Sequence, residues 1–420
     1  MLQLPDSILG LPDVIIEKVE TSQNRTLIIT VQNTKKEIEC SNCGNLTDPH
    51  GHGRKISLRH LPVFDHETYI QIAPARGVCR KCTGHPTTTQ ETSWYDSRSG
   101  YTKAYERYVL MSLINGTISD TSIKEKLGYK AIEAIIDRYV ESEVNWNNIA
   151  EIGLLGIDEI SLKKGYRDYV TLITSRNNGE VKIIGILKGR EKAAVKGFLM
   201  SIPKDLQKTI LAVCTDMYDG FINAAKEALG PDVPVIADRY HVSKLYRQCL
   251  VSLRKKELKR LRESLTKEEY QALHPAISVL CKRKECELTE QEKQELEPLF
   301  KAAPKIKEAY NLCLQLTAIY NKHSNVKEAL ESISLWIEQA EDSKLNCFKT
   351  FIQTLKKYQK EICNYFISRS SSGFVEGFNN KVKVLKRRCY GIFNLKHLFQ
   401  RIFLDFSGYH FLNNLGAAKM

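Results

Sequence analysis

The runs Leu154-Leu155-Gly156-Ile157-Asp158 and Ile210-Leu211-Ala212-Val213-Cys214-Thr215-Asp216 each lead from an apolar stretch directly into a carboxylate. Short apolar runs of this kind predict strands buried in a sheet, and we expect both strands to end at the Asp. An Asp at such a place most often forms a turn or caps a helix, so one alone says little. Two of them at one sheet edge repel each other unless a divalent cation neutralises them, which favours a site with hard oxygen ligands.

Strands and helices alternate around these two runs. The predicted elements are strands at 154–158, 169–174 and 181–187, a helix at 193–202, a strand at 209–215, a helix at 221–229 and a strand at 233–238. Asn177-Asn178-Gly179 between the second and third strands is a strong hairpin signal. The order β-β-β-α-β-α-β, with acids closing the first and fourth strands, fits a ribonuclease-H-like α/β core.

Three nearby acids compete with Asp158 and Asp216 for a role in the site. Asp238 also closes a predicted strand, but that strand lies further along the sheet, so we assign Asp238 a supporting role, with His241 beside it. Glu159 is a direct neighbour of the first run, whereas Asp219 is expected to cap the helix that starts at Gly220.

The charge balance is strongly basic. The 420 residues include 62 Lys or Arg and 49 Asp or Glu, which gives a net charge of +13 and a pI near 9.0. This surplus favours a polyanionic partner, although a basic protein without such a partner has the same composition. Together with the carboxylates, it predicts phosphodiester chemistry on nucleic acid with Mg²⁺ or Mn²⁺.

A third carboxylate, Glu376, stands just ahead of a dense basic stretch in a predicted helix. The apolar stripe of that helix has 3–4 spacing and comprises Val375, Phe378, Val382, Leu385 and Cys389. A second face carries Glu376, Asn380, Lys383 and Arg387. We expect Asn380, Lys383, Arg387 and the adjacent Arg388 to contact DNA phosphates. A solvated charged face, with Glu376 favoured by the helix dipole, remains the alternative.

Four of the twelve cysteines form two C-x2-C pairs, Cys40-Ser41-Asn42-Cys43 and Cys79-Arg80-Lys81-Cys82, with 35 residues between them. Each pair suits a tight knuckle, and two knuckles give a closed four-thiolate site, so Cys40, Cys43, Cys79 and Cys82 predict structural Zn²⁺. The alternatives are unligated cysteines or a site in which a His replaces one Cys, the candidates being His50, His52 and His85. Predicted strands at 14–20, 26–31, 57–63 and 68–72 accompany the pairs, with a turn near Asp65-His66.

Helices are predicted on both sides of the strand-rich core. A helix at 104–114, a short helix at 120–127, a turn at Gly128-Tyr129 and a helix at 130–140 follow the helix-turn-helix pattern, which any small trihelical domain shares. About 130 residues from Lys244 to Ser370 are expected to be helical throughout. Capping boxes begin at Thr266 and Thr289, and Trp336 is expected in the core of this segment.

These motifs together resemble the DDE transposases of bacterial insertion sequences, specifically the ISL-three family. The resemblance covers nearly the whole chain. It depends on the paired cysteines, Gly156-Ile157-Asp158-Glu159, Thr215-Asp216-Met217-Tyr218, Ala237-Asp238-Arg239-Tyr240-His241-Val242 and, most specifically, Val375-Glu376-Gly377-Phe378-Asn379-Asn380-Lys381-Val382-Lys383. It implies that Asp158, Asp216 and Glu376 are a catalytic triad that binds Mg²⁺ or Mn²⁺.

The resemblance also implies an activity and partners. The enzyme would bind terminal inverted repeats and catalyse cleavage and transfer of DNA strands, acting on transposon ends and target DNA as a homodimer or larger assembly. A non-catalytic zinc and helix-turn-helix regulator, a decayed copy and a structure-specific nuclease are the alternatives. No run approaches a membrane-spanning length, and residues 1–19 lack the pattern of a secretory signal, so a cytoplasmic location is expected.

The predicted fold is therefore a multidomain α+β chain in five segments. They are a zinc-binding β module at 1–95, a helix-turn-helix domain at 96–148, the first part of the ribonuclease-H-like core at 149–243, a helical insertion at 244–370, and C-terminal core helices that carry the Glu at 371–420.

Overall fold

A computed structural model describes residues 5–22, 24–162, 169–280, 288–322, 325–368 and 373–417. The chain divides into two units, Met1–Val140 with Phe403–Met420, and Glu141–Ile402. The expected boundary between residues 370 and 371 lies outside the described residues. Within the described residues, no helix is both long enough and apolar enough to cross a membrane.

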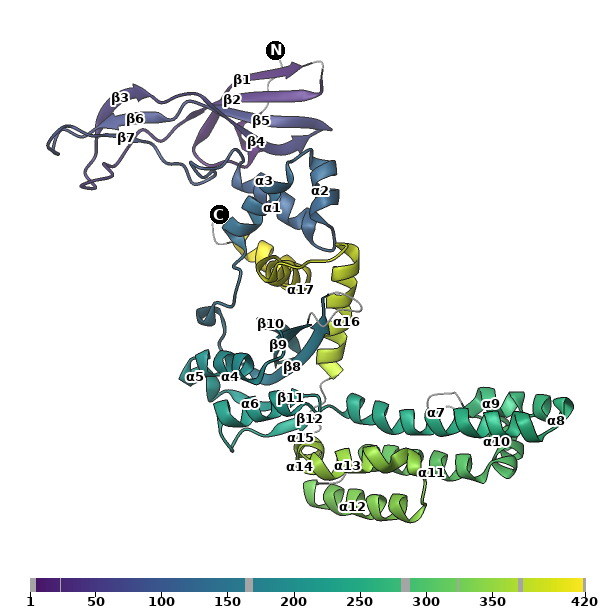
Figure 1. Ribbon diagram of the computed structural model, residues 1–420. Helices are drawn as coiled ribbons and strands as arrows, with labels where there is room; N and C mark the ends of the chain where they lie inside the picture. Colours follow the sequence, from purple (N-terminus) through teal and green to yellow (C-terminus); the bar gives the residue numbers. More distant parts are fainter. Residues whose placement is uncertain are drawn as a thin grey trace. The chain divides into compact units, whose positions relative to one another are not determined.

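The first unit begins with two small sheets (Figure 1). The larger has the order β1-β2-β5-β4 and is built from β1 (Val14–Ser22), β2 (Thr26–Asn33), β4 (Ile56–Val63) and β5 (His66–Ile72). The smaller, which the sequence did not predict, comprises β3 (Asp48–His52), β6 (Ala75–Val78) and β7 (Thr87–Thr89). The predicted turn between β4 and β5 is confirmed, since Phe64 and Asp65 both adopt positive φ.

Three helices follow, and they pack with the end of the chain. They are α1 (Lys103–Leu113), α2 (Ile118–Glu125) and α3 (Tyr129–Tyr139), with Lys126 in the left-handed conformation at the end of α2. Their core includes Leu404 and Leu412 from α17 (Leu395–Ala417). The segment expected at 371–420 is therefore shared between the two units, because the buried leucines of α17 pack with the α1–α3 core.

The second unit is centred on a five-stranded sheet with the order β10-β9-β8-β11-β12. Its strands are β8 (Gly153–Ser161), β9 (Tyr169–Asn177), β10 (Glu180–Lys188), β11 (Ile210–Thr215) and β12 (Val235–Ala237). β8, β9 and β10 pair antiparallel, whereas β8, β11 and β12 run parallel. The predicted hairpin between β9 and β10 is confirmed, with positive φ at Asn178 and Gly179.

Alternation along the strands gives the sheet two buried faces. Leu155, Ile157 and Val213 belong to a core with α4 (Lys192–Ser201) and α6 (Asp219–Leu229). Leu206 of α5 (Lys204–Gln207) packs against the same core. Ala212 and Cys214 belong to the core on the opposite face, with the helical segment that follows β12. Ala212 and Cys214, two residues apart on β11, therefore point toward that segment, because successive side chains of a strand point to opposite faces.

The segment after β12 is helical, as the sequence predicts (Figure 1). It consists of α7 (Arg239–Ser264), α8 (Lys267–Ala272), α9 (His274–Leu280), α10 (Glu290–Ala302), α11 (Pro304–Asn321), α12 (Val326–Asp342), α13 (Lys349–Lys357), α14 (Gln359–Cys363) and α15 (Tyr365–Ser368). Both predicted capping boxes are present, at Thr266 and Thr289. Trp336 is buried, as predicted, and its Nε1 donates to the carbonyl of Leu312 at 2.8 Å.

The sequence prediction was wrong about where the first core strand ends. Asp158 does not close β8 but lies inside it, opposite Leu172 of β9. The parallel partner β11 stops beside Ile157, whereas the antiparallel partner β9 continues pairing as far as Ser161. Asp158 therefore has a paired strand on one side and an open edge on the other.

Close packing brings α16 (Gly373–Arg388) onto the same sheet at Gly156. A Cβ added at Gly156 would come within 2.5 Å of Val375 Cγ2 and 2.6 Å of Thr174 Oγ1. Real Cβ atoms essentially never show such distances, so the missing side chain is what allows this helix to approach β8.

We predict that Gly156→Ala destabilises the chain by about 1–3 kcal/mol, because the added methyl group must displace α16 from β8. Gly197→Ala is the matched control, since a Cβ there meets nothing within 4 Å and Gly197 is exposed inside α4. This change should stabilise by up to about 1 kcal/mol. Chemical denaturation of both variants measures the difference, and an unchanged stability in Gly156→Ala would contradict the packing described.

Candidate active site and zinc site

Parallel pairing places the carboxylates of Asp158 and Asp216 on adjacent strands. Ile157 is in register with Thr215, so the next residues, Asp158 and Asp216, occupy equivalent positions. Thr215 is likewise in register with Ala237, the residue before Asp238. By the two-residue period, Asp158 and Asp216 share the sheet face of Gly156 and Cys214, which α16 and the helical segment cover.

The electrostatic environment of this pair disfavours two negative charges. Burial, and secondarily the charge of Asp158, raises the pKa of Asp216 to about 6. Burial also raises the pKa of Asp158, against a hydrogen bond from the Glu159 amide at 2.7 Å. Oδ1 of Asp216 is buried and has no hydrogen-bond partner among the described residues. An unpaired carboxylate oxygen beside a second buried carboxylate fits a hard divalent cation.

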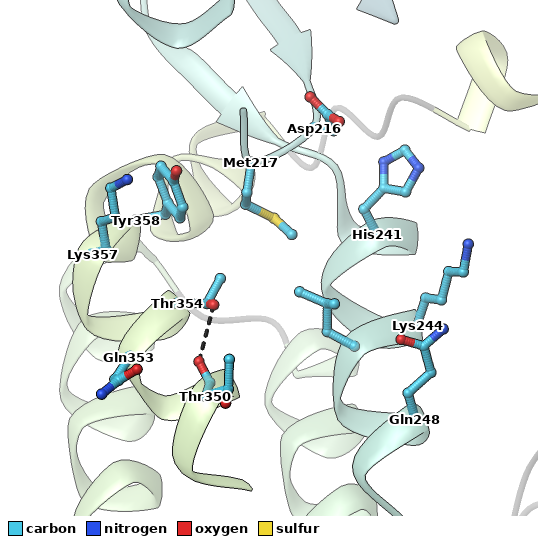
Figure 2. A pocket seen from close by; sticks show the side chains of 11 residues that line it. Asp216, Met217, His241, Lys244, Gln248, Thr350, Gln353, Thr354, Lys357 and Tyr358 are labelled. Carbon is cyan, nitrogen blue, oxygen red and sulfur yellow. Dashed lines mark hydrogen bonds between the residues drawn. The ribbon is translucent and has the colours of Figure 1, made fainter. Parts of the chain in front are cut away.

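Asp238 and His241 lie at the same end of the sheet. Asp238 follows β12, and its side chain accepts a hydrogen bond from the Tyr240 amide at 2.8 Å, so it caps α7. Nδ1 of His241 is 3.5 Å from Oδ2 of Asp238, and Figure 2 shows the imidazole on the side of α7 toward Asp216. Asp238 raises and His241 lowers the pKa of Asp216. Asp238 and His241 therefore both interact electrostatically with the Asp216 carboxylate.

The expected cap at Asp219 was wrong. The α6 helix begins at Asp219 itself, and the carboxylate makes no cap hydrogen bond. It accepts instead from Tyr358 Oη at 2.9 Å and from Lys357 Nζ of α13. Asp219 therefore links α6 to the end of α13.

Asn379 of α16 contacts Asp158 directly, a contact that the sequence analysis missed. Its Nδ2 donates to Asp158 Oδ2, and the Asn379 side chain is buried. Glu376 is half-buried one turn earlier on α16 and makes no hydrogen bond or ion pair within the described part of the chain. Asn379 adjoins the exposed face at i+3 from Glu376, which is the sequence signal that could have identified it.

Three of the four residues of α16 that we expect to contact DNA are exposed. Asn380, Lys383 and Arg387 are exposed, whereas Arg388 is half-buried. Lys383 also lowers the pKa of Asp158, and Lys386 Nζ donates to the carbonyl of Ser161. The lysines of α16 thus hold the helix on β8 and bring positive charge to the carboxylate pair.

The four predicted zinc ligands form one cluster. Their sulfur atoms all lie within 4.8 Å of one another, with Cys40 Sγ 3.9 Å from Cys82 Sγ and Cys43 Sγ 3.7 Å from Cys79 Sγ. Zn–S bonds of about 2.3 Å give a tetrahedron with edges of about 3.8 Å. The spacing therefore fits zinc and is far longer than a disulfide bond.

The environment of the cluster favours metal-bound thiolates. Asn45 Nδ2 donates to Cys43 Sγ at 3.3 Å, which lowers the pKa of Cys43 to about 6. The neighbouring sulfurs, Cys43 first, raise the pKa of Cys82 to about 12, because adjacent thiolates repel. His85 directs its Nδ1 to the Cys79 carbonyl at 3.2 Å, and no histidine belongs to the cluster among the described residues.

Among the described residues, the cysteine cluster is the one group of three or more His, Cys, Asp or Glu side chains whose ligand atoms are near enough to share a metal ion. The carboxylates of Asp158, Asp216 and Glu376 do not converge to the same 4.8 Å spacing. The structure thus brings Asp158 and Asp216 into register and places Glu376 on the helix that packs beside them.

Family models match the chain in three consecutive parts. Residues 36–82 match the zinc-finger of transposases IS204, IS1001, IS1096 and IS1165, and residues 90–140 match the helix-turn-helix domain of transposase family ISL3. Residues 155–402, more than half of the chain, match the transposase domain of the DDE type in the same family. The chain belongs to the ISL3 family of DDE transposases.

Two relatives of this transposase match along most of their length. The transposase for insertion sequence element IS1001 of Bordetella parapertussis is 25% identical over 409 residues, which cover 97% of this chain and 98% of the relative. The transposase for insertion sequence element IS1557 of Mycobacterium tuberculosis is 22% identical over 392 residues, covering 88% and 86%. A solved strand transfer complex of the Drosophila P element transposase matches 77% of this chain and 94% of that chain at 14% identity, with a TM-score of 0.41.

We predict that Cys79→Ser lowers the zinc content of the purified transposase from one ion per chain, because one thiolate of the tetrahedron is lost. Zinc is measured by atomic emission. The matched control is Cys363→Ser, which replaces a buried cysteine in the helical segment and should retain the full zinc content. Equal zinc in both variants would contradict the four-cysteine site.

We predict that Asp216 contributes a loss of stability to the metal-free transposase as the pH rises from about 4 to about 6. In that window the unfolded chain has already ionised Asp216, whereas the folded chain still holds the proton, and a rise to a pKa of about 6 corresponds to about 3 kcal/mol. Asp216→Asn should remove this loss and be more stable than wild type at neutral pH. Urea denaturation across this pH range tests it; equal stability of both proteins at neutral pH would count against the buried charge.

Proposed function

We propose that this transposase cleaves DNA at the ends of its insertion sequence and joins the freed ends to target DNA, with Asp158, Asp216 and Glu376 as its catalytic carboxylates. The observation that supports this most is the in-register pair of buried carboxylates with an unpaired oxygen on Asp216. The sheet order β10-β9-β8-β11-β12 supports a ribonuclease-H-like core interrupted by a helical insertion, with Glu376 beyond it.

In the proposed site, Asp158, Asp216 and Glu376 of α16 would hold Mg²⁺ or Mn²⁺. Bound metal would supply Lewis-acid stabilisation of the phosphate and a more acidic attacking hydroxyl. Asn379 fixes the orientation of the Asp158 carboxylate through its amide. Asp238 and His241 position the first turn of α7 beside Asp216. Asn380, Lys383, Arg387 and Arg388 would bind the phosphates of the strand that reaches the carboxylates.

DNA recognition in this proposal belongs to the first unit. In the helix-turn-helix, α3 is the expected recognition helix, since the second helix of the motif enters the major groove. Tyr129 and Lys130 at its start are exposed, which suits contact with base edges. Zinc would act structurally, because four thiolates leave no open ligand position.

Joining two ends of one element requires both ends in a single complex, so we propose a homodimer or larger assembly on double-stranded DNA. Chromosomal DNA as substrate would place the protein in the bacterial cytoplasm, at the nucleoid. A non-catalytic regulator would use the first unit alone, and its DNA binding would not need the carboxylates.

We predict that the purified transposase, given magnesium and DNA with the inverted repeats that flank its gene, cleaves at the repeat ends. Asp158→Asn and Glu376→Gln should each reduce cleavage by about a thousandfold or more, because a metal ligand supplies several kcal/mol to the transition state. Binding to the repeats should be unchanged. Gel analysis of end-labelled DNA measures 3′-end cleavage and joining.

The matched controls are Asp342→Asn and Glu338→Gln, which make the same chemical changes at exposed positions of α12. Both should cleave like wild type. Tight binding without cleavage by wild type, under magnesium and manganese alike, would favour a regulator or a decayed copy. Cleavage without joining or repeat preference would favour a nuclease.

A further inference from the structure

A pocket of 570 Å³ opens beside Asp216 between α7 and α13 (Figure 2). Met217 and Leu245, both partly buried and packed on the core, contribute its apolar part. Asp216 is the one carboxylate among the residues that line it. A molecule bound here would therefore extend directly from the carboxylate pair along the helical segment. We call this pocket the α7–α13 groove.

Polar side chains repeat at one-turn spacing on both helices of the α7–α13 groove. Lys244 and Gln248 lie four residues apart on α7, and Gln353 and Lys357 lie four residues apart on α13. All four are exposed. In Figure 2 each lysine lies nearer to Asp216 than the glutamine of the same helix. The groove thus offers cationic groups close to Asp216 and amides further away.

The two lysines are not equivalent. Lys357 is paired with Asp219 and lies 4.8 Å from the centre of the Tyr358 ring. Lys244 makes no ion pair with any residue that the structure describes, and a free ammonium group is a good donor to phosphate oxygens. Lys244 is therefore the better placed of the two lysines to bind an anionic group, and His241 lies beside it on the preceding turn.

These groups match the parts of a nucleotide. Glutamine amides both donate and accept, as base edges require, and an apolar floor with the Tyr358 ring suits a base face. The volume lies within the range of about 300–1,000 Å³ that is typical of small-ligand pockets, which corresponds to about one or two nucleotides.

We propose that the α7–α13 groove binds an unpaired stretch of about one or two DNA nucleotides that continues from the strand held at Asp216. This inference deepens the proposed cleavage function and depends on DNA reaching Asp216. The helical segment would thereby separate the strands next to the cleavage position and guide one of them along α7.

The test compares two DNA duplexes that end in the terminal repeat of the element. One is blunt, and the other carries an unpaired extension of two nucleotides with 2-aminopurine as a fluorescent base. Full-length transposase is titrated without added magnesium or manganese, so that no cleavage is needed. We predict that wild type binds the extended duplex about tenfold more tightly than the blunt one and quenches the fluorescent base.

Gln248→Ala with Gln353→Ala should reduce this preference to less than about twofold and leave binding of the blunt duplex unchanged. Gln291→Ala with Gln294→Ala is the matched control, since both glutamines are exposed on α10 and do not line the groove. This control should keep the wild-type preference. In a second measurement, Lys244→Gln should lower the salt dependence of binding by about one phosphate contact for the extended duplex alone.

Equal binding of both duplexes by wild type, or an undiminished preference in the Gln248 and Gln353 double variant, would overturn the proposal. Displacement of the extension by a free deoxynucleoside monophosphate as readily as by a dinucleotide would instead assign the groove to a mononucleotide. The binding assay and the cleavage assay can fail independently. A protein that prefers the extension but never cleaves would keep the groove and lose the proposed catalysis.

Discussion

Parallel pairing of β8 with β11 is the constraint on which the site depends. The register of Ile157 with Thr215 gives Asp158 and Asp216 equivalent places on neighbouring strands, on one face, under a covering layer of helices. Two carboxylates in such surroundings resist ionisation, and the raised pKa of both expresses that cost. A divalent cation would relieve it, in line with the metal site proposed for this pair.

The cysteine cluster in the first unit also brings together ligands of like charge, in this case soft thiolates instead of hard carboxylates. Four sulfurs share a volume in which their thiolates repel, and the pKa of Cys43 and that of Cys82 are driven in opposite directions. Here four thiolates would fill every ligand position of a tetrahedral metal ion, so no position is left for a substrate. The carboxylate pair, by contrast, adjoins the α7–α13 groove, which Asp216 lines.

The region around Asp158 is assembled from segments that are far apart in the chain. Gly156 lets α16 approach β8, and this approach delivers Asn379 to Asp158 from 221 residues away. On the other side, the link from Asp219 to Lys357 and Tyr358 fixes the end of α13 near Asp216. Two helices that are distant in sequence, α16 and α13, therefore pack near the strand ends that carry Asp158 and Asp216.

The sequence by itself determined the features that depend on local chemistry. Asn178-Gly179 adopts the positive φ values of a tight hairpin, and Thr266 and Thr289 start helices with capping boxes, because each feature needs neighbouring residues alone. The two C-x2-C pairs identified the cysteines that meet in one cluster, because each pair is a local motif with two metal-ligating thiols. The acids Asp158 and Asp216 could be chosen from their apolar runs and the family resemblance. Their side-by-side register could be expected from the strand order.

The tertiary structure alone decided what depends on long-range pairing. β8 continues past Asp158 because β9 still pairs with it there, and the end of α17 joins the core of α1–α3 through Leu404 and Leu412. The sequence does not distinguish Asn379 from the other polar residues of its helix. Its contact with Asp158 arises only because the helix packs on β8. The α7–α13 groove exists because two helices about a hundred residues apart flank Asp216. No local pattern encodes such contacts, since they arise from the packing of segments that are distant in sequence.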